Sequence, residues 1–242
     1  MPSNLRQQEP PLWWGAALQG STELVVGLLS TSTGSVDIDR PYKGLTAVMG
    51  ASRKNHHRVV EVLLQNGAGV DHRNDDGFTA LSLAANNGHY RVARVLLQNG
   101  ATVFSGSNSG FTALMLSAQN GHLVVAAMLV RAGAELEARN VVGLTALHLA
   151  AMHGQFAVVK LLAEVGANPD THTPSGEGPL YSAAFRGHAD IVKLLLGLGV
   201  NPARAVANVL GEMGSPLRAA AQDGHKETVR ELLQLGIEAC GG

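Results

Sequence analysis

Histidine is the residue in this sequence that most directly suggests chemistry, because imidazole binds metal ions and transfers protons near neutral pH. The chain has ten histidines, and five of them occupy one recurring position, directly after the residue that interrupts a helical pattern. These five are His56, His89, His122, His188 and His225. A position that recurs throughout the chain is better explained by a structural hydrogen bond than by metal binding. We therefore expect no metal site.

Other reactive groups form no recognisable catalytic or cofactor-binding motif. The single cysteine, Cys240, allows neither a disulfide within the chain nor a thiolate metal cluster. The sequence contains no His-Glu-x-x-His, no Gly-x-x-x-x-Gly-Lys-Ser/Thr, no Gly-x-Gly-x-x-Gly and no Gly-x-Ser-x-Gly. We therefore predict no catalytic residues, no cofactor and no enzymatic activity.

Charge and hydropathy argue against several classes of partner. The chain has 18 Lys and Arg residues against 19 Asp and Glu, so no strong net charge attracts nucleic acid or an anionic membrane. Its longest apolar runs, such as residues 123–130, are far shorter than the ~20 residues of a membrane helix. No convincing cleavage site follows the apolar patch at residues 12–18, so we expect no signal peptide. With one cysteine, the sequence favours an intracellular, cytoplasmic location, with the nucleus as the alternative.

The elements that carry these histidines are repeated along the chain. The segment Gly77-Phe78-Thr79-Ala80-Leu81 recurs in similar form at Gly110 and Gly143, each time after 33 residues. The same phase continues back to Gly44 and forward to Gly176. Five units in strict phase predict a stack in which each unit packs against its neighbours.

Each unit has the pattern of two helices. In the unit at 74–106, a first helix begins near Thr79, whose hydroxyl can cap the exposed amides. Asn99-Gly100 could form a hairpin turn, but because it follows Val-Leu-Leu-Gln we predict a left-handed helix cap at the glycine. The second helix has an apolar stripe spaced i, i+3, i+4, formed by Val92, Val95 and Leu96.

The units resemble ankyrin repeats. Residues 143–151, Gly-Leu-Thr-Ala-Leu-His-Leu-Ala-Ala, come closest to the Gly-x-Thr-Pro-Leu-His-x-Ala-Ala of that family. They depart from it at Ala146, where the family prefers proline, whereas Pro179 and Pro216 restore the proline in two other units. The resemblance implies an all-α, ankyrin-type solenoid of helix-turn-helix repeats joined by short β-hairpin-like loops.

The predicted organisation is a single array over residues 12–238, with a flexible leader at 1–11 and a flexible tail at 239–242. Extra residues around 30–36 and within 200–213 lengthen two connections between units. In the first unit we expect the second-helix stripe at Leu24, Leu28 and Leu29, and in the last unit the polar Thr228 and Glu231 suit an outer cap. The repeats are predicted near residues 12–40, 41–73, 74–106, 107–139, 140–172, 173–209 and 210–238.

The resemblance also implies the function. A stack of this kind offers a long open groove and no deep cavity, which suits a protein or peptide partner better than an enzymatic reaction. We expect a monomer that binds its partner through residues just before each first helix and at its end. These residues are Tyr42, Lys43, Arg53, Lys54, Phe78, Asn86, Asn87, Phe111, Gln119, Asn120, Val141, Val142, Leu144, Met152, His153, Phe185 and Arg186.

Some alternatives stay open at the level of sequence. The equivalent residues Leu45, Phe78, Phe111 and Leu144 either pack against the neighbouring hairpin, which we favour, or form exposed anchors for a partner. The basic stretch 52–58 either receives an acidic partner segment or is a solvated face, which we favour. The whole stack could instead serve as a structural spacer segment of a larger protein.

Overall fold

A computed structural model describes residues 10–31, 37–202, 206–207 and 213–239. Residues 1–9 of the predicted leader, the extra residues at 32–36, most of the second insertion and the tail residues 240–242 with Cys240 lie outside the described residues. The first helices of successive pairs are α1 (Leu12–Gln19), α3 (Ala47–Arg53), α5 (Ala80–Asn86), α7 (Ala113–Gln119), α9 (Ala146–Met152), α11 (Pro179–Phe185) and α13 (Pro216–Gln222). The second helices are α2 (Thr22–Thr31), α4 (His57–Gln65), α6 (Tyr90–Gln98), α8 (Leu123–Arg131), α10 (Phe156–Glu164), α12 (Ala189–Gly197) and α14 (Lys226–Ala239).

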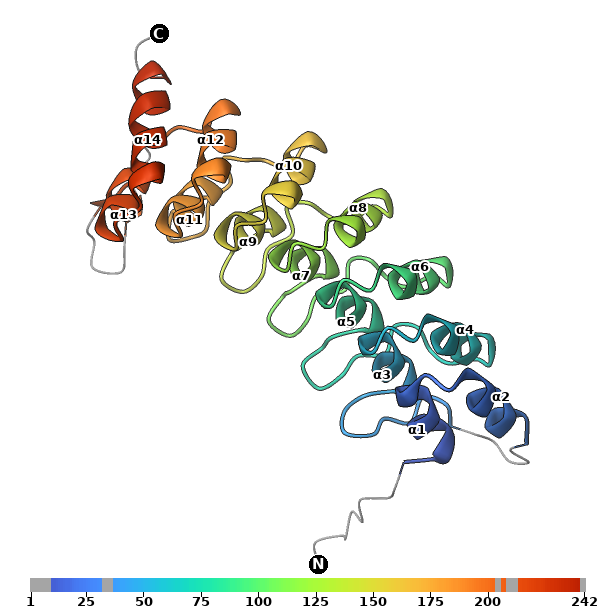
Figure 1. Cartoon of the computed structure of the whole chain (residues 1–242). Helices are drawn as coiled ribbons and strands as arrows, with labels where there is room; N and C mark the ends of the chain where they lie inside the picture. The colour runs from blue at the N-terminus through green and yellow to red at the C-terminus, as the bar shows by residue number, and fades with distance from the viewer. Residues whose placement is uncertain (1–9, 32–36, 203–205, 208–212, 240–242) are drawn as a thin grey trace, which may run out of the picture.

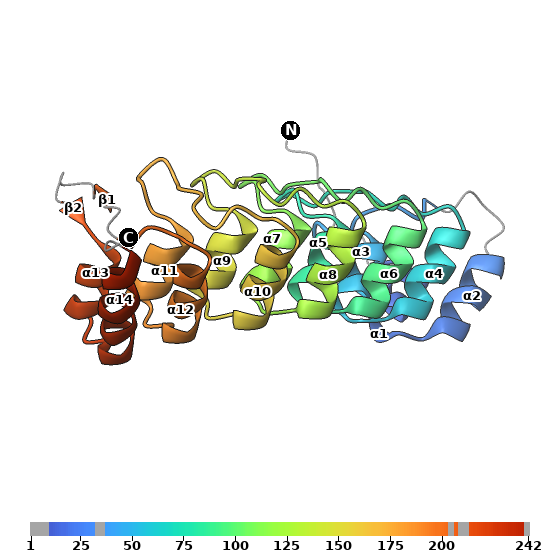
Figure 2. The ribbon, with the colours of Figure 1, turned by 90° about the horizontal axis from the view of Figure 1, so that it is seen from above.

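The helix pairs stack into a gently curved solenoid, which confirms the predicted fold class. The first helices form a row on the concave side of the curve, and the second helices form a row on the convex side (Figure 1). We call them the inner and the outer helices. The connecting loops run along one edge of the stack, and the turns between the two helices of each pair lie at the opposite edge (Figure 2). Where one repeat ends and the next begins remains a prediction.

The predicted capping residues set the ends of the helices. The hydroxyl of Thr79 accepts the Ser82 backbone N–H at 3.3 Å, and Thr46 and Thr112 do the same in their own units. Outer helix α6 is followed by Asn99 and by Gly100, which has a φ of +82°. A left-handed residue at this place closes the helix, so the prediction of a helix cap rather than a hairpin turn is confirmed.

The core runs continuously along the stack and consists mostly of small aliphatic side chains. Val92 and Leu96 of α6 are fully buried, and Val59 and Leu63 occupy the equivalent places in α4. No single pair could bury both of its faces, so each pair depends on its neighbours for most of its apolar burial.

Both ends of the stack correct the predicted apolar stripe. In α2, Leu24 is 52% exposed and Val25 is fully buried, so the expected position of Leu24 in the stripe is wrong. In α14, Thr228 is fully buried, so it does not belong to an outer cap. Both findings have one explanation: this position faces the preceding helix pair, which is absent for α2 among the described residues and present for α14.

The longer connection between α12 and α13 contains a short hairpin. Strands β1 (Val206–Ala207) and β2 (Met213–Gly214) pair antiparallel, with Val206 opposite Gly214. The sequence predicts extra residues here but not that they would pair. Described loops elsewhere in the stack contain tight turns, such as the one in which the Asn74 N–H donates to the Phe78 carbonyl at 3.0 Å.

Candidate partner-binding surface

The recurring histidines join neighbouring helix pairs. The Nε2 atom of His89 lies 3.1 Å from the carbonyl oxygen of Arg53, the last residue of the preceding inner helix. Gln155 takes the same place in its pair and donates to the Gln119 carbonyl at 3.2 Å. The structural hydrogen bond predicted for these histidines is therefore present. The remaining links join His56 to Leu18, His122 to Asn86, His188 to Met152 and His225 to Phe185, at 3.1–3.2 Å.

Four of the five rings lie over a glycine of the preceding turn, whereas the turn before His89 has Asn55, which is itself left-handed with a φ of +67°. Gly88 has a φ of +71°, and a Cβ atom there would lie 2.5 Å from Nδ1 of His122. Glycine is thus needed twice, because the backbone is left-handed and because the imidazole occupies the space of a side chain. These links hold the turns between inner and outer helices in register along one edge of the stack.

We call the residues at the inner-helix ends on that edge the turn row. It comprises the last residue of α3, α5, α7, α9 and α11 and the residue that follows each of them. All are exposed except Gln119 and Met152, which are half-buried. The structure therefore brings ten of the predicted contact residues into one line. They are Arg53, Lys54, Asn86, Asn87, Gln119, Asn120, Met152, His153, Phe185 and Arg186.

The other predicted contact residues lie on the loop edge, and they differ in exposure. Val141 is 73% exposed at a loop tip, beside the exposed Val142. Lys43 is exposed as well, but Tyr42 is half-buried because its ring packs edge-on against Trp14 at 5.0 Å between centroids. Part of the Tyr42 surface is thus occupied by its contact with the first helix pair.

The apolar residues that precede the inner helices are half-buried. Leu45, Phe111 and Leu144 pack against the core, as the favoured interpretation predicts, and Phe78 is equally half-buried. They support the loops, and their contact with a partner stays a prediction.

A hollow on the concave side joins three residues of the turn row to side chains that the sequence analysis did not single out. Its volume is about 170 Å³, and its lining comprises Met152, Glu177, Tyr181, Ser182, Phe185 and Arg186. This space is below the range of roughly 300–1,000 Å³ that is typical of small-molecule sites. It suits a single bulky side chain of a partner.

Two aromatic rings line this hollow. Tyr181 and Phe185 stack with their centroids 6.3 Å apart and their planes at 12°, and the Arg186 guanidinium carbon lies 5.6 Å from the Phe185 centroid. Burial raises the pKa of Tyr181, and the carboxylates of Glu177 and Asp223 raise it further. Tyr181 follows His148 by 33 residues, so the two occupy the same position of successive repeats. This spacing is the signal in the sequence that could have drawn attention to the aromatic residue.

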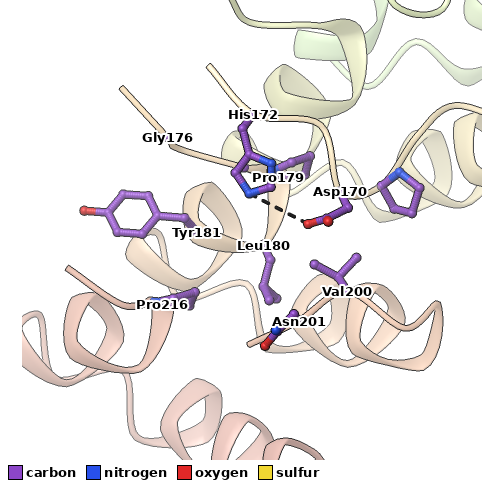
Figure 3. Close-up of a pocket in the computed structure, with 11 residues that line it drawn as sticks. Asp170, His172, Gly176, Pro179, Leu180, Tyr181, Val200, Asn201 and Pro216 are labelled. Carbon is purple, nitrogen blue, oxygen red and sulfur yellow. Dashed lines mark ion pairs between the residues drawn. The ribbon is translucent and has the colours of Figure 1, made fainter. Parts of the chain in front are cut away.

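A second hollow lies beside the loop that leads into α11, and it is too small to hold a side chain of a partner. His172 and Asp170 form an ion pair of 3.7 Å on one side of it, and Leu180 and Pro216 are among the residues that line it (Figure 3). Its volume of about 10 Å³ is close to the minimum for one water molecule. Nor does any group of three or more His, Cys, Asp or Glu in the described part of the chain have an arrangement that could hold a metal ion.

Among the residues that the structure describes, His148 in α9 is the most deeply buried ionisable group. Its Nδ1 lies 3.2 Å from the Thr145 backbone nitrogen, which can only donate, so Nδ1 accepts and Nε2 carries the proton. Nε2 donates to the Glu177 carbonyl at 3.1 Å, which links α9 to the next loop. Burial lowers the pKa of His148 to about 4, so this imidazole is neutral at physiological pH.

Carboxylates in the loops form a second set of links that the sequence analysis missed. Asp71 accepts the Thr102 N–H at 2.9 Å, and Glu137 accepts the Asn168 N–H at 2.8 Å. The interval of 66 residues between the two acids, twice the repeat, is the signal that could have revealed them. The intervening position holds Phe104, which is 63% exposed.

Comparison with known families bears on this architecture. A family model described as ankyrin repeats, in three copies, matches residues 12–106, 102–173 and 165–240. The chain belongs to the ankyrin repeat family. Ankyrin repeats are generally protein–protein interaction modules, and the fold is typically non-enzymatic. A search of curated proteins found no match.

The described helices also bear on membrane insertion. None of those in the described part of the chain combines the length and the hydropathy that crossing a bilayer would require. The chain's place among ankyrin repeats suggests a protein as its partner.

Proposed function

We propose that this ankyrin stack is a non-enzymatic module that binds a protein or peptide partner in its concave groove. It acts as a monomer, in an intracellular compartment. The observation that carries the proposal is the hollow formed by Met152, Tyr181, Phe185 and Arg186 beside the exposed turn row.

The chemistry of this hollow is that of an interaction hot spot. Tyrosine and arginine are enriched among the residues that dominate binding energy, and such residues cluster in pockets that a partner's side chain can fill. Phe185 and Arg186 are exposed, so a partner would remove their apolar surface from water. The exposed Val141 and Val142 extend the apolar surface to the loop edge of the groove.

Affinity capture with a groove variant tests the proposal. The variant combines Val142→Asp, Met152→Asp and Phe185→Asp, which place carboxylates on both edges of the groove. The matched control combines Val26→Asp, Val165→Asp and Leu198→Asp, at exposed apolar positions in or just after outer helices. Circular dichroism checks that both variants fold.

We expect the control to retain the partners of the wild type and the groove variant to lose them. If the folded groove variant recovers the same partners as the wild type, the groove is not the binding surface. If the wild type captures no specific partner, the spacer interpretation gains support instead. Analytical ultracentrifugation tests the monomeric state.

A further inference from the structure

The side chains of the turn row change in chemistry along the groove. The end of α3 contributes two exposed cations, Arg53 and Lys54. The ends of α9 and α11 contribute Met152 and Phe185, which line the hollow together with Arg186, whose charge is accompanied there by that of Glu177. Between them, the ends of α5 and α7 contribute only carboxamides, namely Asn86, Asn87, Gln119 and Asn120.

The cationic end has few acids around it. Neither Arg53 nor Lys54 forms an ion pair within the described residues. Asp75 and Asp76 belong to the loop that leads into α5, at the opposite end of an inner helix of seven residues, about 10 Å long. Glu23, at the start of α2, belongs to the preceding pair. An anionic group placed at the end of α3 would therefore meet two cations on the turn row.

The carboxamides in the middle are suited to a peptide backbone. Each carries both a donor and an acceptor, and an extended peptide presents unpaired N–H and C=O groups along its length. Hydrogen bonds within the stack orient three of these amides. Asn87 Nδ2 donates to the Leu83 carbonyl at 2.7 Å. Asn120 Nδ2 donates to the Leu116 carbonyl at 2.9 Å and lies 3.2 Å from Asn86 Oδ1.

The turn row is also a rigid template of defined length. The carbonyl of each inner-helix end, from Arg53 to Phe185, is held by the ring or amide of the next pair. Three to four helix-to-helix steps of 8–10 Å separate the cationic end from the hollow, which gives roughly 24–40 Å. An extended chain covers this distance in roughly 7–12 residues, at ~3.3 Å per residue.

We propose that the turn row binds one extended peptide segment of a partner protein, with acidic residues at the α3 end and a bulky apolar side chain in the hollow between α9 and α11. The two features are separated by roughly 7–12 residues of the partner. The amides of α5 and α7 contact the intervening backbone without selecting its sequence. This inference rests on the proposed function and specifies the partner's chemistry.

Selection from a display library of random 16-residue peptides, with the full chain as bait, tests the proposal. The most enriched peptide is then synthesised with a fluorescent label, and its Kd is measured by anisotropy. The charge variant is Arg53→Glu with Lys54→Glu. The control, Arg91→Glu with Arg94→Glu, makes the same charge change on outer helix α6, where both arginines are exposed.

We expect enriched peptides to share an acidic cluster and a bulky apolar residue at the stated spacing. The charge variant should weaken binding about tenfold or more, and the control about twofold or less. Replacing the acids of the peptide with amides should weaken binding to the wild type and have little effect on the charge variant. Phe185→Ala should also weaken binding, and replacing the apolar residue of the peptide should then weaken binding to the wild type but have little effect on binding to the Phe185→Ala variant.

Enriched peptides that lack acids, or that bind the charge variant as well as the wild type, would overturn the proposal. So would a library that enriches no peptide. If the groove variant described above still loses its captured partner in that case, the proposed function stands and the partner docks as a folded surface. If that variant also keeps its partner, both proposals fail.

Discussion

Acidification should destabilise this protein through one buried imidazole. His148 is fully buried, and its neutral form accepts from the Thr145 N–H and donates to the Glu177 carbonyl. A proton on Nδ1 would break the first bond and bury a positive charge near Arg139 and His172, both of which also lower the pKa. The folded state therefore binds this proton only near pH 4.

The size of the effect follows from the difference between the two states. The pKa of His148 is about 4 in the folded chain, against an ordinary value of 6.5 for histidine. Because the unfolded chain binds more protons between these values, stability is full above pH 6.5 and falls as the pH drops towards 4. A shift of this size corresponds to about 3 kcal/mol of unfolding free energy.

Urea unfolding at a series of pH values from 7.5 to about 4 measures this loss. The comparison is with His148→Gln, which keeps a donor towards Glu177 and cannot titrate. We expect the variant to be less stable at pH 7.5, and its stability to fall less with acid than that of the wild type. A matched His153→Gln variant, at an exposed position of the turn row, should keep the acid sensitivity. If wild type and His148→Gln lose stability in parallel, the reasoning about His148 is wrong.

Two further pairs of substitutions test the stack by urea unfolding. Gly110→Ala should destabilise the protein more than Gly100→Ala. Both glycines are left-handed, which costs an alanine about 1–2 kcal/mol of folding free energy at either position. Only at Gly110 would the new Cβ also meet backbone, 2.9 Å from the Asn140 Cα. Equal losses for the two would show that the loops yield freely. Thr228→Val should stabilise by about 1 kcal/mol, because it removes a buried hydroxyl that has no hydrogen-bond partner. Thr79→Val should instead destabilise by about 0.5–2 kcal/mol through loss of a helix cap, and the same sign for both would contradict the assignment.

The repeated parts of the fold could be predicted from the sequence because their causes are local. A threonine that caps a helix and a glycine that closes one act within a few residues, as at Thr79 and Gly100. The 33-residue phase then extends these local features along the chain. The burial of the two ends could not be predicted in this way. Leu24 and Thr228 occupy the same place in their helices, and only the presence of a preceding pair decides which is buried.

The candidate surface was predictable in its position but not in its shape. Met152, Phe185 and Arg186 follow from the position of the inner-helix ends, which the repeat determines. The hollow that they line depends also on Tyr181, whose ring stacks on Phe185. Stacking is a tertiary contact that depends on side-chain rotamers, and the repeat pattern does not determine them.

The links between helix pairs separate what holds the stack together from what a partner meets. Each histidine or glutamine bonds to a main-chain oxygen, which every amino acid supplies, at nearly the same length whether the residue is Arg53, Asn86 or Phe185. Mutations along this edge can therefore alter its charge, size or polarity while the joints between units stay intact. Specificity can evolve here at little structural cost, and a designer could rewrite the edge residue by residue without redesigning the scaffold.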